Sequence, residues 1–191
     1  MDTLTRLIVE AGLLQFGRFQ RGDDVQPLQT HLEMLASYPD VLRYAAERAV
    51  ALLTDIPCDR LLCTRDAVPF GVAVGLQTNL PLVSSQGDPS AIVDDLVGAY
   101  DIGHQTALLT TATAHSTDLT ALISGARRVG LAVSSVIAII SIDDGALPES
   151  VEEQPLLRMT QILDDLVSSG DLPAGHAQTV RQWLARRRAA Y

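Results

Sequence analysis

The residues of this chain that are best suited to chemistry lie in the segment 106–130, TALLTTATAHSTDLTALISGARRVG. Its pattern predicts a buried strand, a short loop of small hydroxylated residues and then an amphipathic helix. Such a loop can hold a phosphate, because the free amides of a first helical turn point toward a bound anion. The candidate ligand-binding residues are two at the end of the strand and four in the turn: Thr110, Thr111, Ala114, His115, Ser116 and Thr117.

Charge near this turn argues against tight binding of a phosphate. Asp118 lies in the first turn of the predicted helix, where a carboxylate suits the helix dipole but repels a phosphate. One like-charge contact at about 4 Å costs about 4 kcal/mol at an effective dielectric constant near 20. Thr110 and Thr111 can form hydrogen bonds with sugar hydroxyls, but they carry no charge with which to orient a magnesium-bound sugar. The segment therefore has the form of a phosphate site without the acids of an enzyme.

Other chemistry-bearing residues have simpler interpretations. His115 has no identifiable catalytic partner, so we assign it no catalytic role. The paired aspartates at 94–95 and 143–144 are expected to be solvated acids, because adjacent carboxylates rarely converge on one cation. The arginines at 186–188, close to Trp183, are expected to form the basic last turn of a helix rather than a nucleic-acid contact. We therefore assign no catalytic residue and no metal site.

The composition indicates a globular protein of one domain. The chain has 191 residues, of which 47% are hydrophobic and 19% charged, enough for a sizeable core. Its formal net charge of −9 argues against non-specific binding to nucleic acid or anionic membranes. No apolar run approaches the ~20 residues of a membrane helix, and the amino-terminal segment is interpreted as a first helix rather than a signal peptide. We expect a cytoplasmic protein in which Cys58 and Cys63 are free thiols.

The spacing of apolar residues predicts an α/β fold. Helices are expected at 4–16, 38–54, 68–78 and 117–129, and strands at 59–64, 80–84, 106–111 and 134–142. Strands that alternate with helices in this way indicate a mostly parallel sheet with helices on both faces.

The remaining segments connect or extend this core. Residues 20–30 are expected to form a loop or a short hairpin, and 85–103 an excursion between elements. Two more helices are expected at 154–169 and 176–190. We therefore divide the chain into a domain at 1–150 and a carboxyl-terminal helical extension at 151–191 that packs on it.

Three segments resemble the type I phosphoribosyltransferases, and among them orotate phosphoribosyltransferase. The segment 10–40, EAGLLQFGRFQRGDDVQPLQTHLEMLASYPD, is similar to the amino-terminal region of that enzyme. The segment 59–83, DRLLCTRDAVPFGVAVGLQTNLPLV, is similar to its second region, and 106–141 to the one with the loop for phosphoribosyl pyrophosphate (PRPP). The match runs in register over residues 7–145. It implies the fold of that family, a mostly parallel sheet flanked by helices, and a homodimer, for which the stripe Val68–Thr78 with Gly71 and Gly75 is a candidate contact face.

Each functional motif of the family is altered here. The family places two acidic residues at the strand end to bind the ribose hydroxyls, and this chain has Thr110 and Thr111. The pyrophosphate turn is represented by residues 64–67, in which Arg65 is the one cation that could meet a diphosphate and is followed by Asp66. The orotate loop is represented by 21–25, RGDDV, with two acids where the family favours cations.

The expected catalytic loop, 84–103, lacks the lysines and the histidine of the family, and the chain has no lysine at all because its 14 basic residues are all arginine. Nothing in it neutralises the departing pyrophosphate, which is the main task of charge stabilisation in this reaction. We therefore expect that transfer of orotate is lost.

Three functions fit these observations. The leading hypothesis is a non-catalytic nucleotide or phosphate binder, or a dimeric regulatory protein, without a cofactor and with Mg²⁺ only if PRPP binding is retained. The second is an active, divergent phosphoribosyltransferase of nucleotide metabolism that uses another base or phosphosugar. The third is a nucleic-acid-binding regulator, which the charge of −9 makes the least favoured.

Overall fold

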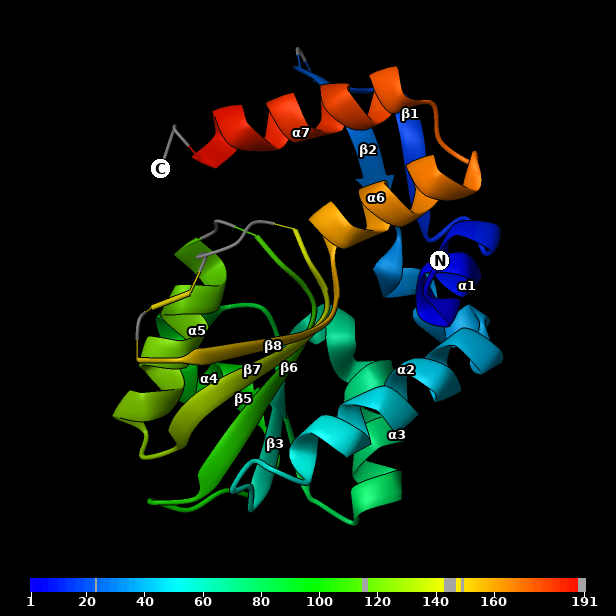
Figure 1. The fold of residues 1–191 in the computed structure, drawn as a ribbon. Coiled ribbons are helices and arrows are strands. Elements are labelled where there is room, and N and C mark those ends of the chain that lie inside the picture. The colour runs from blue at the N-terminus through cyan, green and yellow to red at the C-terminus, as the bar shows by residue number, and fades with distance from the viewer. Residues whose placement is uncertain (23, 115–116, 143–146, 149, 189–191) are drawn as a thin grey trace.

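A computed structural model describes residues 1–22, 24–114, 117–142, 147, 148 and 150–188. Its centre is a six-stranded sheet in the order β5-β4-β3-β6-β7-β8 (Figure 1). Five strands are parallel and the short β5 runs antiparallel to β4 at one edge. The strands are β3 (Arg60–Cys63), β4 (Leu82–Ser85), β5 (Leu96–Val97), β6 (Gln105–Thr113), β7 (Ala132–Ser141) and β8 (Glu152–Arg158).

Helices cover both faces of this sheet, as Figure 1 shows. On one face lie α2 (Pro39–Leu53) and α3 (Val68–Thr78), and on the other α4 (Ile92–Asp95) and α5 (Thr117–Arg128). Successive residues of a strand point to opposite faces, and in β6 Leu109 joins the core under α2 and α3 while Leu108 joins the core under α5. The strands β6 and β7 are therefore buried on both faces, which explains their nearly continuous apolar sequences. The predicted α/β fold is confirmed.

A smaller layer lies beyond the carboxyl ends of the strands (Figure 1). It contains α1 (Thr3–Glu10), an antiparallel hairpin of β1 (Leu14–Arg21) and β2 (Asp24–Thr30), α6 (Met159–Ser169) and α7 (Ala174–Arg188). The helix α7 lies across the hairpin and packs on β2. Short 3₁₀ turns, η1 (Leu32–Ser37), η2 (Arg65–Ala67) and η3 (Pro89–Ala91), connect the elements. Within the described residues, the longest helices are too short or too polar to cross a membrane.

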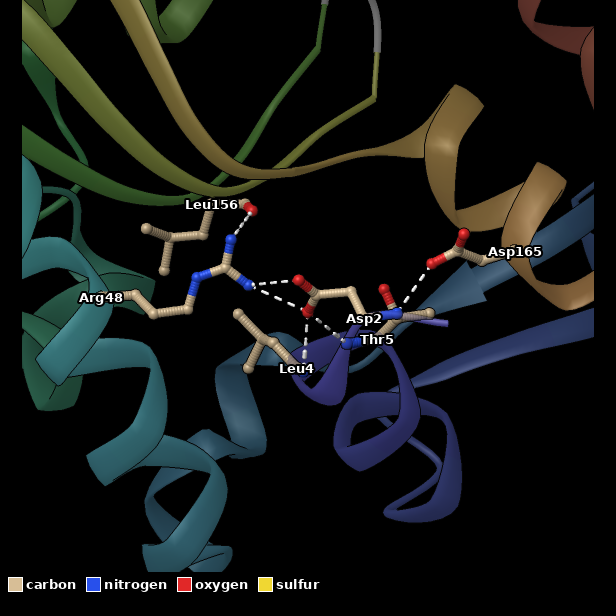
Figure 2. Close-up of polar contacts among 6 residues, drawn as sticks. All are labelled: Asp2, Leu4, Thr5, Arg48, Leu156 and Asp165. Carbon is tan, nitrogen blue, oxygen red and sulfur yellow. Dashed lines mark hydrogen bonds and ion pairs between the residues drawn. The ribbon is translucent and has the colours of Figure 1, made fainter.

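Arg48 of α2 joins the two layers (Figure 2). Its Nη1 donates to both carboxylate oxygens of Asp2 at 2.9 Å, and its Nη2 donates to the Leu156 carbonyl of β8 at 2.8 Å. The Asp2 carboxylate also accepts from the Leu4 amide at 2.8 Å and so caps α1. The Asp2 amide donates to Asp165 of α6 at 2.8 Å. Arg48 thus links α2 to Asp2 at the start of α1 and to β8, and Asp2 in turn links to α6.

Three predicted elements differ from the observed ones. The helix expected at 4–16 ends at Glu10, because Gly12 adopts a φ of 70° and the following residues pair as β1. The segment 20–30, expected as a loop or short hairpin, is a hairpin that already begins at Leu14. The helix expected at 154–169 begins at Met159, since residues 152–158 pair with β7 as a sixth strand. The excursion at 85–103 contains η3, α4 and β5.

The two glycines of the predicted contact stripe do not face outward. A Cβ on Gly71 would lie 3.0 Å from the Leu82 side chain and 3.2 Å from Cys63, and one on Gly75 would lie 3.1 Å from the Leu80 carbonyl oxygen. These glycines therefore allow α3 to lie close on β3 and β4, and the expectation that they belong to a partner-contacting face is wrong.

Candidate functional site

The pyrophosphate turn and the end of β6 meet at one edge of the sheet. The strands β3 and β6 are parallel neighbours, so the residues after their carboxyl ends converge there. A cavity of about 260 Å³, the smaller cavity, lies between these ends, the loop after β4 and the start of α5. Its lining includes the predicted residues Arg65, Asp66 and Thr110, together with Thr64 and Asp118.

The hydroxyls of the two threonines are occupied by bonds within the protein. Thr111 Oγ1 donates to Asp66 Oδ2. Thr64 Oγ1 donates to Thr110 Oγ1 at 3.2 Å, and Thr110 Oγ1 donates to the Ala112 carbonyl at 3.3 Å. Both Thr110 and Thr111 are buried, with 4% and 6% of their surface exposed. The strand end is therefore linked to the pyrophosphate turn, and its hydroxyls do not stand free toward a ligand.

The charges around the smaller cavity do not favour an anion. Arg65 is its one basic side chain among the described residues, and it donates to the Gln86 carbonyl at 3.4 Å. Two carboxylates, Asp66 and Asp118, line the same space. Beneath the turn, burial and the charge of Asp66 raise the pKa of the Cys63 thiol to about 12, so this thiol is neutral and a poor nucleophile.

A buried carboxylate fixes the loop that forms one wall of the smaller cavity. Asp95 is 2% exposed and accepts hydrogen bonds from Ser85 Oγ at 2.6 Å, from the Gln86 amide at 3.0 Å and from the Asp88 amide at 2.6 Å. The expectation of two solvated acids at 94–95 is therefore wrong for Asp95, while Asp94 is exposed. The second pair, at 143–144, lies outside the described residues. No cluster of three potential metal-ligating side chains occurs in the part of the chain that the structure describes.

A second hollow of about 590 Å³, the larger cavity, separates the two layers. It is bounded by the hairpin, by α7 and by the ends of β6 and β7, where Ala114 and Ile142 lie. Its lining is polar but largely uncharged, with Arg187 and Glu33 as its fixed charges. The Arg187 guanidinium lies 4.7 Å from the centroid of the Trp183 ring. The remaining lining residues are Phe19, Gln20, Gln26, Leu28, Gln29, Thr30 and His31.

Comparison with known proteins places this arrangement in a fold family. No family model matches the sequence, and no curated protein sequence matches it either. Similar solved structures are UMP synthase from Leishmania donovani (TM-score 0.82, 21% identity, 96% of this chain and 42% of that one) and orotate phosphoribosyltransferase from Francisella tularensis (TM-score 0.72, 13% identity, 97% and 98%). A third is orotate phosphoribosyltransferase from Mycobacterium tuberculosis in complex with PRPP (TM-score 0.65, 13% identity, 83% and 96%).

The chain has the type I phosphoribosyltransferase fold. The resemblance seen in the three sequence segments is thereby confirmed at the level of the fold. This chain spans less than half of the Leishmania protein but nearly the whole of the Francisella one.

In this phosphoribosyltransferase fold, the predicted site residues divide between two cavities. Arg65, Asp66 and Thr110 line the smaller cavity, Thr111 bonds to Asp66, and Ala114 lines the larger cavity. The predicted His115 and Ser116 lie outside the described residues. Thr117 begins α5, but its side chain also lies outside the description.

The structure also shows lining residues that sequence reasoning missed. Gln20 and Gln26 line the larger cavity, and they flank the segment 21–25 that was matched to the orotate loop. Trp183 and Arg187 come from α7, more than 150 residues along the chain from the hairpin. The one feature of the sequence that could have indicated them is Trp183 close to the run of arginines at 186–188. We interpreted this run as the basic last turn of a helix.

Proposed function

We propose that this chain binds a phosphorylated small molecule without transferring a phosphoribosyl group to orotate. The observation that carries the proposal is the bond from Thr111 to Asp66 at the end of β6. A neutral hydroxyl held by a neighbouring carboxylate gives a magnesium-bound ribose neither charge nor a free ligand. The two acids beside Arg65 further weaken an interaction with the diphosphate of PRPP.

The larger cavity supports the binding part of the proposal. Its volume of about 590 Å³ lies within the range of small-molecule sites, and its lining combines aromatic and amide side chains. Trp183 and Phe19 provide apolar surface for a planar group, and Gln26 and Gln29 provide both hydrogen-bond donors and acceptors. Arg187 is the cation that faces a phosphate there. The complex of the Mycobacterium enzyme with PRPP is an example of a phosphorylated ligand bound by this fold.

Ligand binding and turnover can be measured on the same protein. Isothermal titration calorimetry with UMP, AMP and PRPP, each with and without Mg²⁺, measures binding, and release of pyrophosphate from PRPP with orotate, uracil or adenine measures transfer. We expect a monophosphate to bind, no Mg²⁺-dependent gain for PRPP and no pyrophosphate release. Release with any base would replace the proposal with an active, divergent phosphoribosyltransferase. Absence of binding by every phosphorylated compound would leave only the regulatory hypothesis.

Three arginine variants identify the cavity that is used. Arg187→Ala removes the cation of the larger cavity, and Arg65→Ala removes that of the smaller cavity. Arg43→Ala is the matched control, because Arg43 is an exposed arginine of α2 paired with Asp40. We expect about tenfold weaker monophosphate binding for Arg187→Ala alone, since a lost charge-assisted hydrogen bond is worth about 1.5 kcal/mol. Weakening by Arg65→Ala alone would place the ligand in the smaller cavity instead.

We also propose that the chain forms a homodimer through the outer face of α3. Val72 and Leu76 are one helical turn apart on this face and are 45% and 82% exposed. Light scattering after size exclusion is expected to give a dimer for the wild type and a monomer for Leu76→Glu, whose charge cannot be buried in an apolar contact. Gln77→Glu, on an exposed position of the same helix, is the control. A monomeric wild type, or a dimeric Leu76→Glu, would contradict the proposal.

A further inference from the structure

A third hollow lies on the other side of Trp183, between the hairpin and α7. This outer groove has a volume of about 400 Å³ and is separate from the two cavities described above, with Trp183 as the residue that it shares with the larger cavity. Its basic lining residues are Arg18 from β1 and His176 and Arg186 from α7, and the two arginines are its fixed positive charges. No carboxylate among the described residues lines it.

The basic character of the outer groove contrasts with the rest of the protein. The helix α7 carries four of the fourteen arginines and no acid, although the chain as a whole has a net charge of −9. Two arginines of this helix have partners: Arg181 donates to Asp164 at 2.5 Å, and Arg187 stacks on Trp183. Arg18 and Arg186 have no such contact with any described residue.

The side chains around these cations fit a ligand that carries several negative charges. Thr179 and Gln182 lie along the same face of α7. The Gln182 amide can donate hydrogen bonds to a ligand, whereas the Thr179 hydroxyl donates to the Gly175 carbonyl at 3.0 Å. The groove also has apolar lining residues, Val25, Pro27 and Trp183. Cations brought together at one groove repel one another, and a bound polyanion removes that repulsion and adds charge-assisted hydrogen bonds.

We propose that the outer groove is a binding site for a small phosphorylated molecule with two or more negative charges. A nucleic acid is less well matched, because a polymer that extended beyond the groove would meet the acidic remainder of the chain. The site does not depend on the proposed function, since its basic residues differ from those of the larger cavity. Its ligand contacts the indole that also lines the larger cavity, so occupancy of the outer groove changes the emission of Trp183, the only tryptophan of the chain.

The probes are inorganic pyrophosphate and tripolyphosphate, titrated into the full chain by calorimetry and by tryptophan fluorescence at low and at physiological salt. We expect tripolyphosphate to bind more tightly than pyrophosphate, and higher salt to weaken both. Arg18→Ala and Arg186→Ala are each expected to weaken tripolyphosphate binding at least fivefold, and the double variant more than twentyfold. Arg43→Ala and Arg187→Ala are the controls, the first for net charge and the second for the larger cavity.

Each other result has a definite meaning. Unchanged tripolyphosphate affinity in the double variant, or no binding by the wild type at millimolar concentration, overturns the proposal. Tighter binding of a single-stranded 20-nucleotide RNA, lost in the same double variant, replaces the small ligand with a nucleic acid. Arg18 and Arg186 are exposed, so their variants are expected to unfold at the wild-type temperature, which circular dichroism checks. If Arg187→Ala abolishes monophosphate binding while tripolyphosphate still binds, the two sites are independent.

Discussion

At the scale of single residues, a side-chain hydrogen bond joins the end of β6 to the turn at residues 64–67. Thr111 is buried, and its hydroxyl donates a hydrogen bond to Asp66 of the pyrophosphate turn. A carboxylate at position 111 would instead face Asp66 with a like charge, which is costly at such short range. Threonine at 111 and aspartate at 66 are therefore compatible with each other. Their hydrogen bond occupies the hydroxyl that would otherwise be free to contact a ligand.

Removal of that hydroxyl tests the link. Thr111→Val keeps the shape of the side chain but takes the donor from Asp66, and we expect a loss of about 1 kcal/mol in the free energy of unfolding, measured with urea. Thr54→Val, on an exposed threonine that bonds only to its own helix, should stay within about 0.5 kcal/mol. Equal effects for both variants would show that the Thr111 bond contributes nothing specific.

The raised pKa of the Cys63 thiol predicts that the free energy of unfolding depends on pH in alkaline solution. Its pKa is about 12 in the folded chain, raised chiefly by burial, against a usual value of 9.0. The folded state therefore disfavours the thiolate, so stability from this group is complete below pH 9 and is lost as pH rises toward 12. Unfolding free energies of the wild type should fall with pH in this window by up to about 1.4 kcal/mol per unit more than those of Cys63→Ala. Parallel pH profiles for the two proteins would contradict this.

At the scale of elements, the excursion between β4 and β6 is organised around one carboxylate. Asp95 is the last residue of α4. Its carboxylate accepts hydrogen bonds from the hydroxyl of Ser85 and from the amides of Gln86 and Asp88. A buried charge is tolerated when hydrogen bonds satisfy it, and here three donors do so. The same bonds fix the wall of the smaller cavity, so its shape depends on a residue that does not line it.

Asp95→Asn should therefore be costly. The amide loses the charge and leaves at least one of the three donors without a good acceptor, so we expect a loss of about 2–3 kcal/mol in unfolding free energy. Faster amide hydrogen exchange at residues 86 and 88 is expected with it. The neighbouring Asp94→Asn is the control, because Asp94 is exposed and should change stability by less than about 0.5 kcal/mol. A similar small effect at both positions would refute the role given to Asp95.

At the scale of the whole molecule, the larger cavity depends on how the hairpin layer sits over the sheet. Its walls come from β1, β2 and α7 on one side and from the ends of β6 and β7 on the other. The polar junction at Arg48 holds these layers together through Asp2 and the Leu156 carbonyl (Figure 2). Both side chains are about two-thirds buried, so water screens this pair less than a surface pair.

Arg48→Ala tests the junction. It leaves Asp2 and the Leu156 carbonyl without their partner, and we expect about 2–3 kcal/mol lower stability. Because the junction holds the start of α1 through Asp2, the amides of α1 should lose protection from hydrogen exchange before those of β6 and β7. Arg43→Ala, in the same helix and largely exposed, should have little effect. Uniform loss of protection across both layers would show that the junction does not act locally.

The strands and helices of the central sheet could be predicted from the sequence because the patterns that indicate them span only a few neighbouring residues. The apolar runs of β6 and β7 and the periodicity of α2 are set by neighbours a few residues apart, and they predicted both element type and fold. The same reasoning extended α1 past Gly12 and placed a helix at 154–158. Apolar spacing over so few residues fits a strand as well as a helix. These segments are strands because they pair with another strand of the fold.

The amino-acid sequence by itself determined the α/β alternation, the absence of lysine and the presence of two neutral residues, Thr110 and Thr111, at the end of a strand. Only the tertiary structure decided that Thr111 bonds to Asp66, that Asp95 is buried, and that α7 closes the larger cavity and forms the outer groove with the hairpin. The reason is physical. Periodicity and charge are properties of the chain, whereas burial and hydrogen-bond partners arise when segments that are separated in the sequence exclude water from the same space.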